Sequence, residues 1–404
     1  MAGSSDMNRY HTTRGSTKVS GGLWRARGVL PTALALAIAG AGSGSSNASS
    51  GDSPIAGPGA TGQAIHFQRE SFRLASRIED KIKNHQPLNF AMSYPYLTIA
   101  GAPAQLTAGM NQAATQIQRQ YGVKINTKMM GSPDANTTTE IEQITAGLKA
   151  NQFDCLGVAP VPPGAFSNLI NSTLASGVPF YTVNTDSPMS HRIAYYGAND
   201  NQVMNSPLQM GRIAAQYTIG WAHRNRITLD GKQVALITGD ATAPWAQGRM
   251  QGFVDGIKAA YPLVTVVGTP SHAYSTGFDA PTVISDMTSF MTGHPNVFFY
   301  FDSDWGSVQI GQLIARRGLK GKVFTLGYNL NSAYVQLLKD HDVIGTVDQR
   351  YDLQAKNWVL GCAQLLLKGK APNAYEFVKP SVWTPDNVNE ALALYAKIPY
   401  SGVS

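Results

Sequence analysis

The chain has 404 residues, of which 43% are hydrophobic and only 14% are charged, and its formal net charge is +7. At roughly 150 residues per domain, this length predicts two or three domains, and the low charged fraction excludes a disordered or coiled-coil protein. The two cysteines, Cys155 and Cys362, are too few for a disulfide scaffold or a thiolate zinc site, so no metal or other cofactor is expected.

Most of the positive charge lies near the amino terminus. Residues 1–46 hold five cations and one acid, so +4 of the net charge is there and +3 is spread over the other 358 residues. After residue 46 no run rich in Lys or Arg is interleaved with aromatic residues. Nucleic-acid binding has little electrostatic support, and no nucleic-acid partner is expected.

Residues 1–41 have the pattern of a secretory signal peptide. A basic flank ending at Arg27 precedes about a dozen apolar residues, the length of a signal core rather than of a membrane span. Small residues predict cleavage after Ala41, and residues 42–87 are predicted to form a Ser/Gly-rich tether and a charged helical extension. Ser43 stands where a lipoprotein has its cysteine, so a lipid anchor is not expected. An uncleaved transmembrane anchor is the alternative, and the short apolar run argues against it.

From Leu88 onward, short apolar runs alternate with segments of helical periodicity. The runs are continuous, which is typical of buried parallel strands. The first series has predicted strands at 89–97, 123–130, 153–160, 178–185 and 192–198 and helices at 109–123 and 140–152. The second has predicted strands at 233–240, 264–271, 297–303, 323–329 and 343–349 and helices at 210–224, 249–262, 281–295 and 306–318. Two such arrays predict an α/β fold with two doubly wound, Rossmann-like lobes of parallel sheet.

Seven short sequence motifs occur in order between residues 177 and 390. They are GVPFYTVNTDSP (177–188), GANDNQ (197–202), RMQGF (249–253), HPNVFFYFDSD (294–304), VFTLGYN (323–329), GTVDQ (345–349) and WTPDNVNE (383–390). Together they resemble the type I periplasmic solute-binding proteins of ABC importers, in the ribose/galactose-binding branch, whose fold is similar to LacI-type repressor cores. The resemblance covers about residues 88–401.

The resemblance implies two lobes joined by three hinge crossovers, near Asn199, Gln349 and Val378. The expected lobes are residues 88–198 with 350–377 and residues 199–349 with 378–404. In open α/β sheets ligands bind beyond the carboxyl ends of the strands, so two facing sheets would form one cleft. Hinge closure would then bury the ligand.

The same resemblance assigns ligand contacts to polar residues that follow predicted strands. Asn184 and Asn329 each stand where the family usually has Asp, and Gln349 matches a contact position at the second hinge. Asp186 is the alternative acceptor beside Asn184, unless it serves only the turn before Pro188. A hydroxyl group both donates and accepts, so a polyol needs such amide and carboxylate partners when it is desolvated.

Three further candidates, Asp302, Ser303 and Asp304, follow one predicted strand directly. The alignment puts Ser303 at the usual contact position, with Asp304 just after it, and leaves open which side chain points inward. One of the two acids is expected to cap the next helix.

Arg249 is the strongest single candidate, because its guanidinium can donate to two ligand oxygens at once. Without the resemblance, a solvated arginine on a helix surface would be the preferred interpretation. Trp245, just before it, is expected either to shield a sugar face or to pack at the helix start. Tyr274 fits the position of a stacking aromatic residue. In the first loop the family's aromatic cluster is absent, and Tyr94 is the nearest candidate.

These residues predict an exported, monomeric receptor that binds a sugar or sugar-like polyol and presents it to an ABC permease, in the periplasm or at the cell surface of a bacterium. One arginine among several carboxylates suits a neutral ligand better than a dicarboxylate. No chemistry is expected.

Three other functions share features with this prediction. A secreted α/β enzyme is disfavoured because no G-x-S-x-G, P-loop or G-x-G-x-x-G motif occurs and none of the eight histidines lies in a catalytic motif. A LacI-type repressor would need an amino-terminal helix-turn-helix where a signal sequence stands. A sensor that binds the same ligand and signals to a membrane receptor stays open.

Both cysteines belong to the predicted first lobe. Cys155 lies in a predicted strand and Cys362 in a predicted helix. Isolated buried cysteines are expected, and a disulfide formed after export is the alternative.

Overall fold

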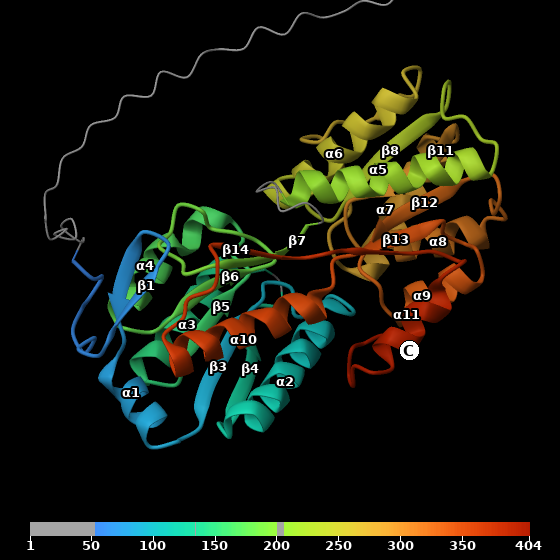
Figure 1. Cartoon of the computed structure of the whole chain (residues 1–404). Coiled ribbons are helices and arrows are strands. Elements are labelled where there is room, and N and C mark those ends of the chain that lie inside the picture. The colour runs from blue at the N-terminus through green and yellow to red at the C-terminus, as the bar shows by residue number, and fades with distance from the viewer. Residues whose placement is uncertain (1–52, 134, 200–205) are drawn as a thin grey trace, which may run out of the picture. The chain divides into compact units, whose positions relative to one another are not determined.

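Two parallel sheets, each covered by helices, organise the chain (Figure 1). The computed structural model describes residues 53–133, 135–199 and 206–404, and the residues from Asp52 onward form one compact unit. The predicted signal peptide, residues 1–41, and the first part of the tether lie outside the described residues. In the described ranges no helix combines the length and the apolar character needed to span a bilayer.

The first lobe is built on a six-stranded sheet in which every pair of neighbouring strands is parallel. The strand order is β14-β7-β6-β5-β3-β4. Its strands are β3 (Leu88–Ser93), β4 (Ile125–Met130), β5 (Cys155–Val158), β6 (Phe180–Val183), β7 (Tyr195–Ala198) and β14 (Tyr375–Val378). Its helical segments are α2 (Ala102–Tyr121), α3 (Thr137–Lys149), η1 (Pro163–Phe166), α4 (Ser167–Ala175) and α10 (Tyr351–Lys368).

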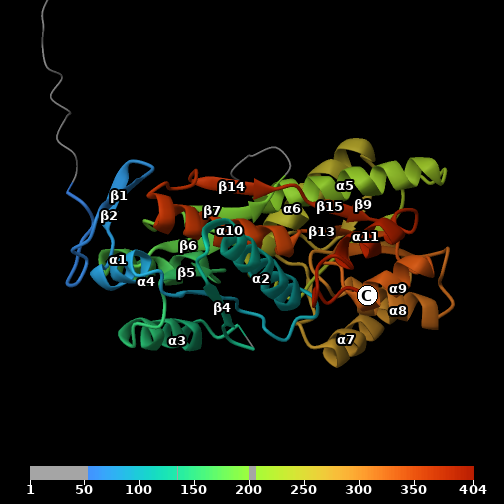
Figure 2. The same ribbon diagram turned by 60° about the horizontal axis from the view of Figure 1, so that its bottom comes forward.

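The second lobe is built on a seven-stranded sheet of order β10-β8-β11-β12-β13-β15, with β9 beside β8. Its strands are β8 (Gln233–Thr238), β9 (Thr265–Val267), β10 (Tyr274–Ser275), β11 (Val297–Asp302), β12 (Phe324–Tyr328), β13 (Gly345–Asp348) and β15 (Ser381–Trp383). Its helices are α5 (Ser206–Arg224), α6 (Pro244–Ala260), α7 (Ala280–Gly293), α8 (Ser307–Arg316), α9 (Ser332–Lys339) and α11 (Val388–Tyr395). The turned view of Figure 2 shows these helices around their sheet.

The α/β prediction with two lobes of parallel sheet is confirmed, with one correction. Strand β15 runs antiparallel to β13, because it enters this sheet directly from β14 of the other sheet. The chain passes between the lobes between β13 and α10, at Gln349, and again between β14 and β15. The crossing predicted near Asn199 comes after β7, and residues 200–205, which follow it, lie outside the described residues.

The segment before β3 is only partly the predicted helical extension. Strands β1 (Ala64–Phe67) and β2 (Glu70–Arg73) form an antiparallel hairpin. The helical part of this segment is α1 (Ser76–Lys83). In β1 the buried Ile65 and Phe67 flank the exposed His66, which is the period of a strand rather than of a helix. Asp154, fully buried, holds α1 to this lobe through ion pairs with Arg77 and Lys81.

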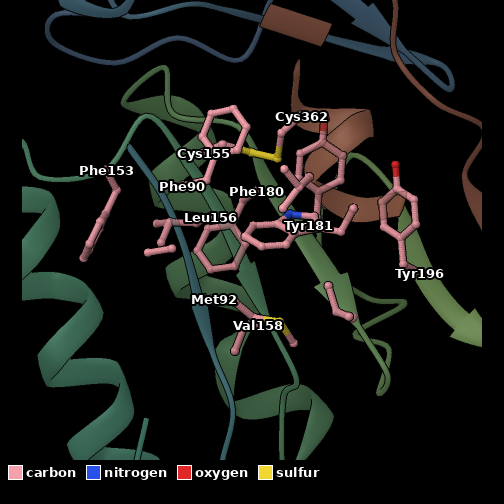
Figure 3. Close-up of a cluster of buried hydrophobic side chains, with 14 of the residues drawn as sticks. Phe90, Met92, Phe153, Cys155, Leu156, Val158, Phe180, Tyr181, Tyr196 and Cys362 are labelled. Atoms are coloured by element: carbon pink, nitrogen blue, oxygen red, sulfur yellow. A yellow bond between two sulfur atoms is a disulfide. The ribbon is translucent and has the colours of Figure 1, made fainter. Parts of the chain in front are cut away.

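The prediction of two isolated cysteines is wrong, because Cys155 and Cys362 form a disulfide. It joins β5 to α10 inside the core of the first lobe, among Phe90, Phe180 and Tyr181 (Figure 3). Both cysteines are fully buried and 207 positions apart. The bond therefore fixes the helix that follows the Gln349 crossing onto the sheet.

Candidate ligand-binding cleft

A small cavity lies where the carboxyl ends of strands from both lobes meet. The first lobe contributes side chains that follow β3, β5 and β6, together with Tyr351 at the start of α10. The second lobe contributes side chains that follow β8 and β11. The lining residues are Tyr94, Pro95, Tyr96, Ile99, Ala159, Val161, Asn184, Thr185, Trp245, Arg249, Asp304 and Tyr351. The free space among them is about 20 Å³, whereas ligand pockets typically measure ~300–1,000 Å³. The lining side chains therefore nearly fill the cleft in this conformation.

The side-chain amide of Gln349 is the centre of the polar network beside this cavity. Its Oε1 accepts hydrogen bonds from Arg249 Nη2 at 2.7 Å and from Asn184 Nδ2 at 3.1 Å. Its Nε2 donates to Asn329 Oδ1 at 2.7 Å and to the Tyr351 hydroxyl at 2.9 Å. Gln349 is only 3% exposed. One amide at the passage between the lobes thus joins polar groups from both.

Arg249 is held rigidly in the first turns of α6. Its Nη1 donates to the Ser303 carbonyl oxygen at 2.8 Å, and its guanidinium carbon lies 4.5 Å and 5.0 Å from the ring centres of Tyr328 and Trp245. The side chain is 6% exposed, so it is not a solvated surface arginine. Its Nε has no partner among the described residues. Buried donors are almost always satisfied, so this N–H is available to a ligand oxygen.

The three residues after β11 have three different roles. Asp302 accepts the backbone N–H of Ser307, the first residue of α8, at 2.5 Å. The N-cap position itself is Gly306, so neither acid is the predicted N-cap, although Asp302 satisfies one N–H of the first helical turn. The Ser303 hydroxyl points back into the sheet and donates to Thr238 Oγ1 at 2.8 Å. Asp304 is the one that lines the cavity.

Burial is the main influence on both acids. It raises the pKa of Asp304 to about 6, and the nearby Arg249 partly opposes that rise. Burial, together with the charge of Asp304, also raises the pKa of Asp302 well above its usual value. Asp304 also accepts a hydrogen bond from Asn329 Nδ2 at 3.4 Å.

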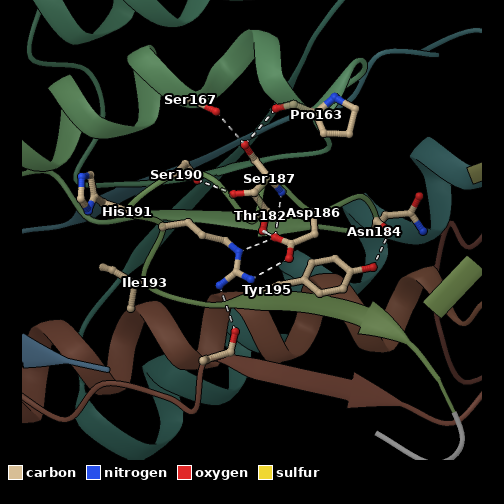
Figure 4. A network of polar contacts seen from close by, with 12 residues as sticks. Pro163, Ser167, Thr182, Asn184, Asp186, Ser187, Ser190, His191, Ile193 and Tyr195 are labelled. Carbon is tan, nitrogen blue, oxygen red and sulfur yellow. Dashed lines mark hydrogen bonds and ion pairs between the residues drawn. The ribbon is translucent and has the colours of Figure 1, made fainter. Parts of the chain in front are cut away.

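Asp186 does not line the cavity; it organises the loop after β6 (Figure 4). Arg192 forms a two-pronged ion pair with it, and the Thr182 hydroxyl and the Ser187 backbone N–H also donate to it. The Tyr195 hydroxyl donates to the Asn184 carbonyl oxygen at 2.7 Å. This arrangement fixes Asn184 at the cavity edge.

Two of the three predicted aromatic candidates lie at the cavity, and the third does not. Tyr94 and Trp245 line the cavity, and the Tyr94 hydroxyl lies 3.4 Å from that of Tyr351. Tyr274 does not: its hydroxyl donates to the Asp286 carbonyl oxygen, and its ring packs on Phe290 at 4.5 Å. Strand β10, which carries Tyr274, is an edge strand of its sheet.

Seven lining residues were not predicted from the sequence, and three of them carry a hydroxyl group: Tyr96, Thr185 and Tyr351. Tyr351 follows Gln349 by two positions, so the hinge assignment itself was a usable signal for it. Tyr96 lies in the first loop, where the alignment with the family is poor, and packs at 4.7 Å on Phe278 of the second lobe. Among the described residues no group of three or more His, Cys, Asp or Glu side chains is arranged to hold a metal ion.

Comparison with known proteins agrees with this architecture. Residues 90–371 match a family model described as the periplasmic binding protein domain. A D-ribose/D-allose-binding protein from Pseudomonas aeruginosa is 25% identical over 268 residues, which cover 65% of this chain and 78% of that protein.

Solved structures agree with it as well. An ABC transporter solute-binding protein from Burkholderia graminis, in complex with D-arabinose, superposes with a TM-score of 0.63 at 21% identity, over 74% of this chain and 96% of that one. A protein described as a LacI transcriptional regulator from Bacteroides fragilis superposes with a TM-score of 0.62 at 17% identity, over 76% and 99%. At these identities the likeness supports the fold, which transport proteins and regulators share.

Proposed function

Because this chain belongs to the family of periplasmic binding protein domains, we propose that it is an exported sugar-binding protein of an ABC importer. It binds a sugar or sugar-like polyol in the cleft between the two lobes and presents it to a membrane permease. It acts as a monomer and leaves the ligand chemically unchanged.

The convergence of polar groups on Gln349 carries this proposal. Arg249 supplies donors, Asp304 supplies acceptors, and the amides of Asn184 and Asn329 supply both. Sugar hydroxyls need both kinds of partner once they are desolvated. Asp304 and Arg249 bring one acid and one cation to the cavity, a balance that favours a neutral ligand over a dicarboxylate.

The relatives support a sugar as the ligand class. The curated relative is a D-ribose/D-allose-binding protein, and the arabinose complex has the same fold. The ligand contacts we propose are the lining residues Tyr94, Asn184, Trp245, Arg249 and Asp304, with Asn329 and Gln349 as their polar neighbours.

Ligand binding in this cleft requires the lobes to open and close. A free volume of about 20 Å³ does not admit a sugar, and the two sheets are joined by short passages such as the one at Gln349. Rotation about such passages is a common way in which two-lobed proteins close on a ligand. We assign residues 88–198 with 350–377 to one moving lobe and residues 199–349 with 378–404 to the other.

The disulfide supports export of the protein. Disulfides persist in oxidising compartments and are rare in the cytosol, so the bond between Cys155 and Cys362 fits a mature protein outside the cytoplasm. The signal-peptide pattern of residues 1–41 points to the same compartment.

A ligand screen by thermal shift tests the proposal. The mature chain, residues 42–404, is screened against pentoses, hexoses, polyols, amino acids and nucleosides, and hits are measured by calorimetry. A sugar or polyol at 100 times its Kd should stabilise the fold by about 2.7 kcal/mol. Stabilisation by amino acids or nucleosides alone, or by no compound, would contradict the proposed ligand class.

A further inference from the structure

Part of the cavity lining is aliphatic. The second lobe contributes Trp245, Arg249 and Asp304, which include both charged groups. The first lobe contributes residues with hydroxyl or amide groups and, from two loops, four aliphatic side chains that we call the aliphatic wall: Pro95, Ile99, Ala159 and Val161. The loops follow β3 and β5, which are hydrogen-bonded neighbours in the sheet, so the two loops leave the sheet from adjacent strands.

Val161 is the part of this wall that is not explained by packing alone. Ile99 and Ala159 are buried in the core of the first lobe, as aliphatic residues usually are. Val161 is only partly buried, yet it lines the cavity. Its carbonyl oxygen accepts the Thr137 hydroxyl at 2.7 Å, which holds this loop against α3. An apolar side chain is thus fixed at the edge of the cleft.

A fully hydroxylated sugar fits this wall poorly. Val161, Ile99 and Ala159 have no side-chain donor or acceptor, so a hydroxyl group facing them loses its water without gaining a partner. A methyl group in the same place would be removed from water at an apolar surface, which is favourable. The other side of the cavity, around Arg249 and Asp304, still meets hydroxyl groups.

We propose that the ligand is a deoxysugar whose methyl group packs on the aliphatic wall while its hydroxyl groups face Arg249 and Asp304. This inference rests on the proposed function, because it names the ligand class of the same cleft. A difference of one group at a hydrophobic contact typically changes affinity by about 10–200-fold.

Pairs of sugars that differ only at the C6 hydroxyl test this inference. The pairs are L-fucose with L-galactose, L-rhamnose with L-mannose, and D-fucose with D-galactose, measured by calorimetry alongside D-ribose, D-allose and D-arabinose. We expect at least one deoxysugar to bind ten or more times more tightly than its hydroxylated partner. Equal affinities within every pair, or binding of fully hydroxylated sugars only, would overturn the inference and leave the proposed function intact. Binding of none of the nine sugars would overturn the inference, and it would contradict the proposed function as well only if the thermal-shift screen also finds no sugar or polyol.

A substitution at the wall provides the second test. Val161→Thr keeps the shape of the side chain and replaces one methyl group by a hydroxyl group. It should therefore reduce the preference for the deoxysugar within a pair by several-fold. The matched control is Val267→Thr, a partly buried valine in β9 of the second lobe that does not line the cavity. An unchanged preference in Val161→Thr, with both variants folded, would remove the wall from the ligand site.

Discussion

Replacing Arg249 by alanine tests the cleft most directly, because this side chain lines the cavity and donates to Gln349, the centre of the polar network. The variant loses the donors to Gln349 and the Ser303 carbonyl oxygen and the free Nε. A hydrogen bond from a charged donor to the ligand contributes about 1.5–3 kcal/mol. Loss of the cation also raises the pKa of Asp304 further, which weakens that acceptor at neutral pH.

These two effects predict a loss of about 2–4 kcal/mol in sugar binding, which corresponds to a Kd roughly 30–1,000 times higher. The fold should persist, because Gln349 Oε1 keeps its bond from Asn184. Calorimetric titration of the best sugar from the screen measures the Kd, and thermal melting measures the stability.

Arg77→Ala is the control for this measurement. Arg77 in α1 pairs with the fully buried Asp154, which precedes β5 at the amino end of that strand, and neither residue lines the cavity. Its loss should lower the melting temperature while the folded protein keeps a Kd within about threefold of the wild type, since this pair contacts no residue of the cavity lining. If Arg249→Ala binds as well as the wild type, or if both variants lose the same affinity, Arg249 is not in the ligand site.

Three further predictions follow from burial and cross-linking. Burial raises the pKa of Asp304 to about 6, so sugar affinity measured by calorimetry should rise between pH 5 and pH 7 as the carboxylate of Asp304 forms. In Asp304→Asn the affinity should be the same across this pH range. A wild-type affinity that does not change with pH would contradict this prediction. Burial raises the pKa of Glu140 from 4.5 to about 7, and among the described residues the Ser93 hydroxyl is its one hydrogen-bond partner. The folded state then holds more protons than the unfolded state over that interval, so stability falls as pH rises through it, and Glu140→Gln should melt at a higher temperature than the wild type at pH 8 but not at pH 4.5. The double variant Cys155→Ala/Cys362→Ala should lose about 3–5 kcal/mol in urea unfolding, because the bond closes a loop of 207 positions; a reductant should destabilise the wild type and leave this variant unchanged.

The fold was predictable because its signals are local. Continuous apolar runs such as 297–303 correspond to β11, and the helical period of 249–262 corresponds to most of α6. The order of such elements limits the topology to a few choices. The hairpin β1–β2 was missed because its alternating pattern, around Ile65 and Phe67, is only a few residues long.

The cleft was predictable in part, for a geometric reason. The sequence places a residue at the end of a strand, but it does not decide which neighbouring side chain turns toward the cavity. After β11, Ser303 turns into the sheet and Asp304 turns outward, although the alignment favoured Ser303. Successive side chains along an extended chain point in opposite directions, so a shift of one position reverses the assignment.

No sequence pattern near either cysteine predicts that the two are bonded to each other. Cys155 and Cys362 become neighbours only because α10 returns to the first lobe after the chain has built the second one. That return also brings Tyr351 beside Tyr94, which no pattern within either segment indicates.

The two asparagines that replace the family's usual aspartates are explained by their neighbours in this chain. Asn184 and Asn329 have φ values of 68° and 69°, in the left-handed region that Asn and Asp tolerate better than most residues. The backbone therefore permits Asn or Asp at both positions, and the contacts of the side chain determine which of the two residues fits. Asn184 donates to Gln349 Oε1, which a carboxylate cannot do, and an aspartate at 329 would put a second negative charge against Asp304. Among the residues that line the cavity, Asp304 is thus the one acid and Arg249 the one cation.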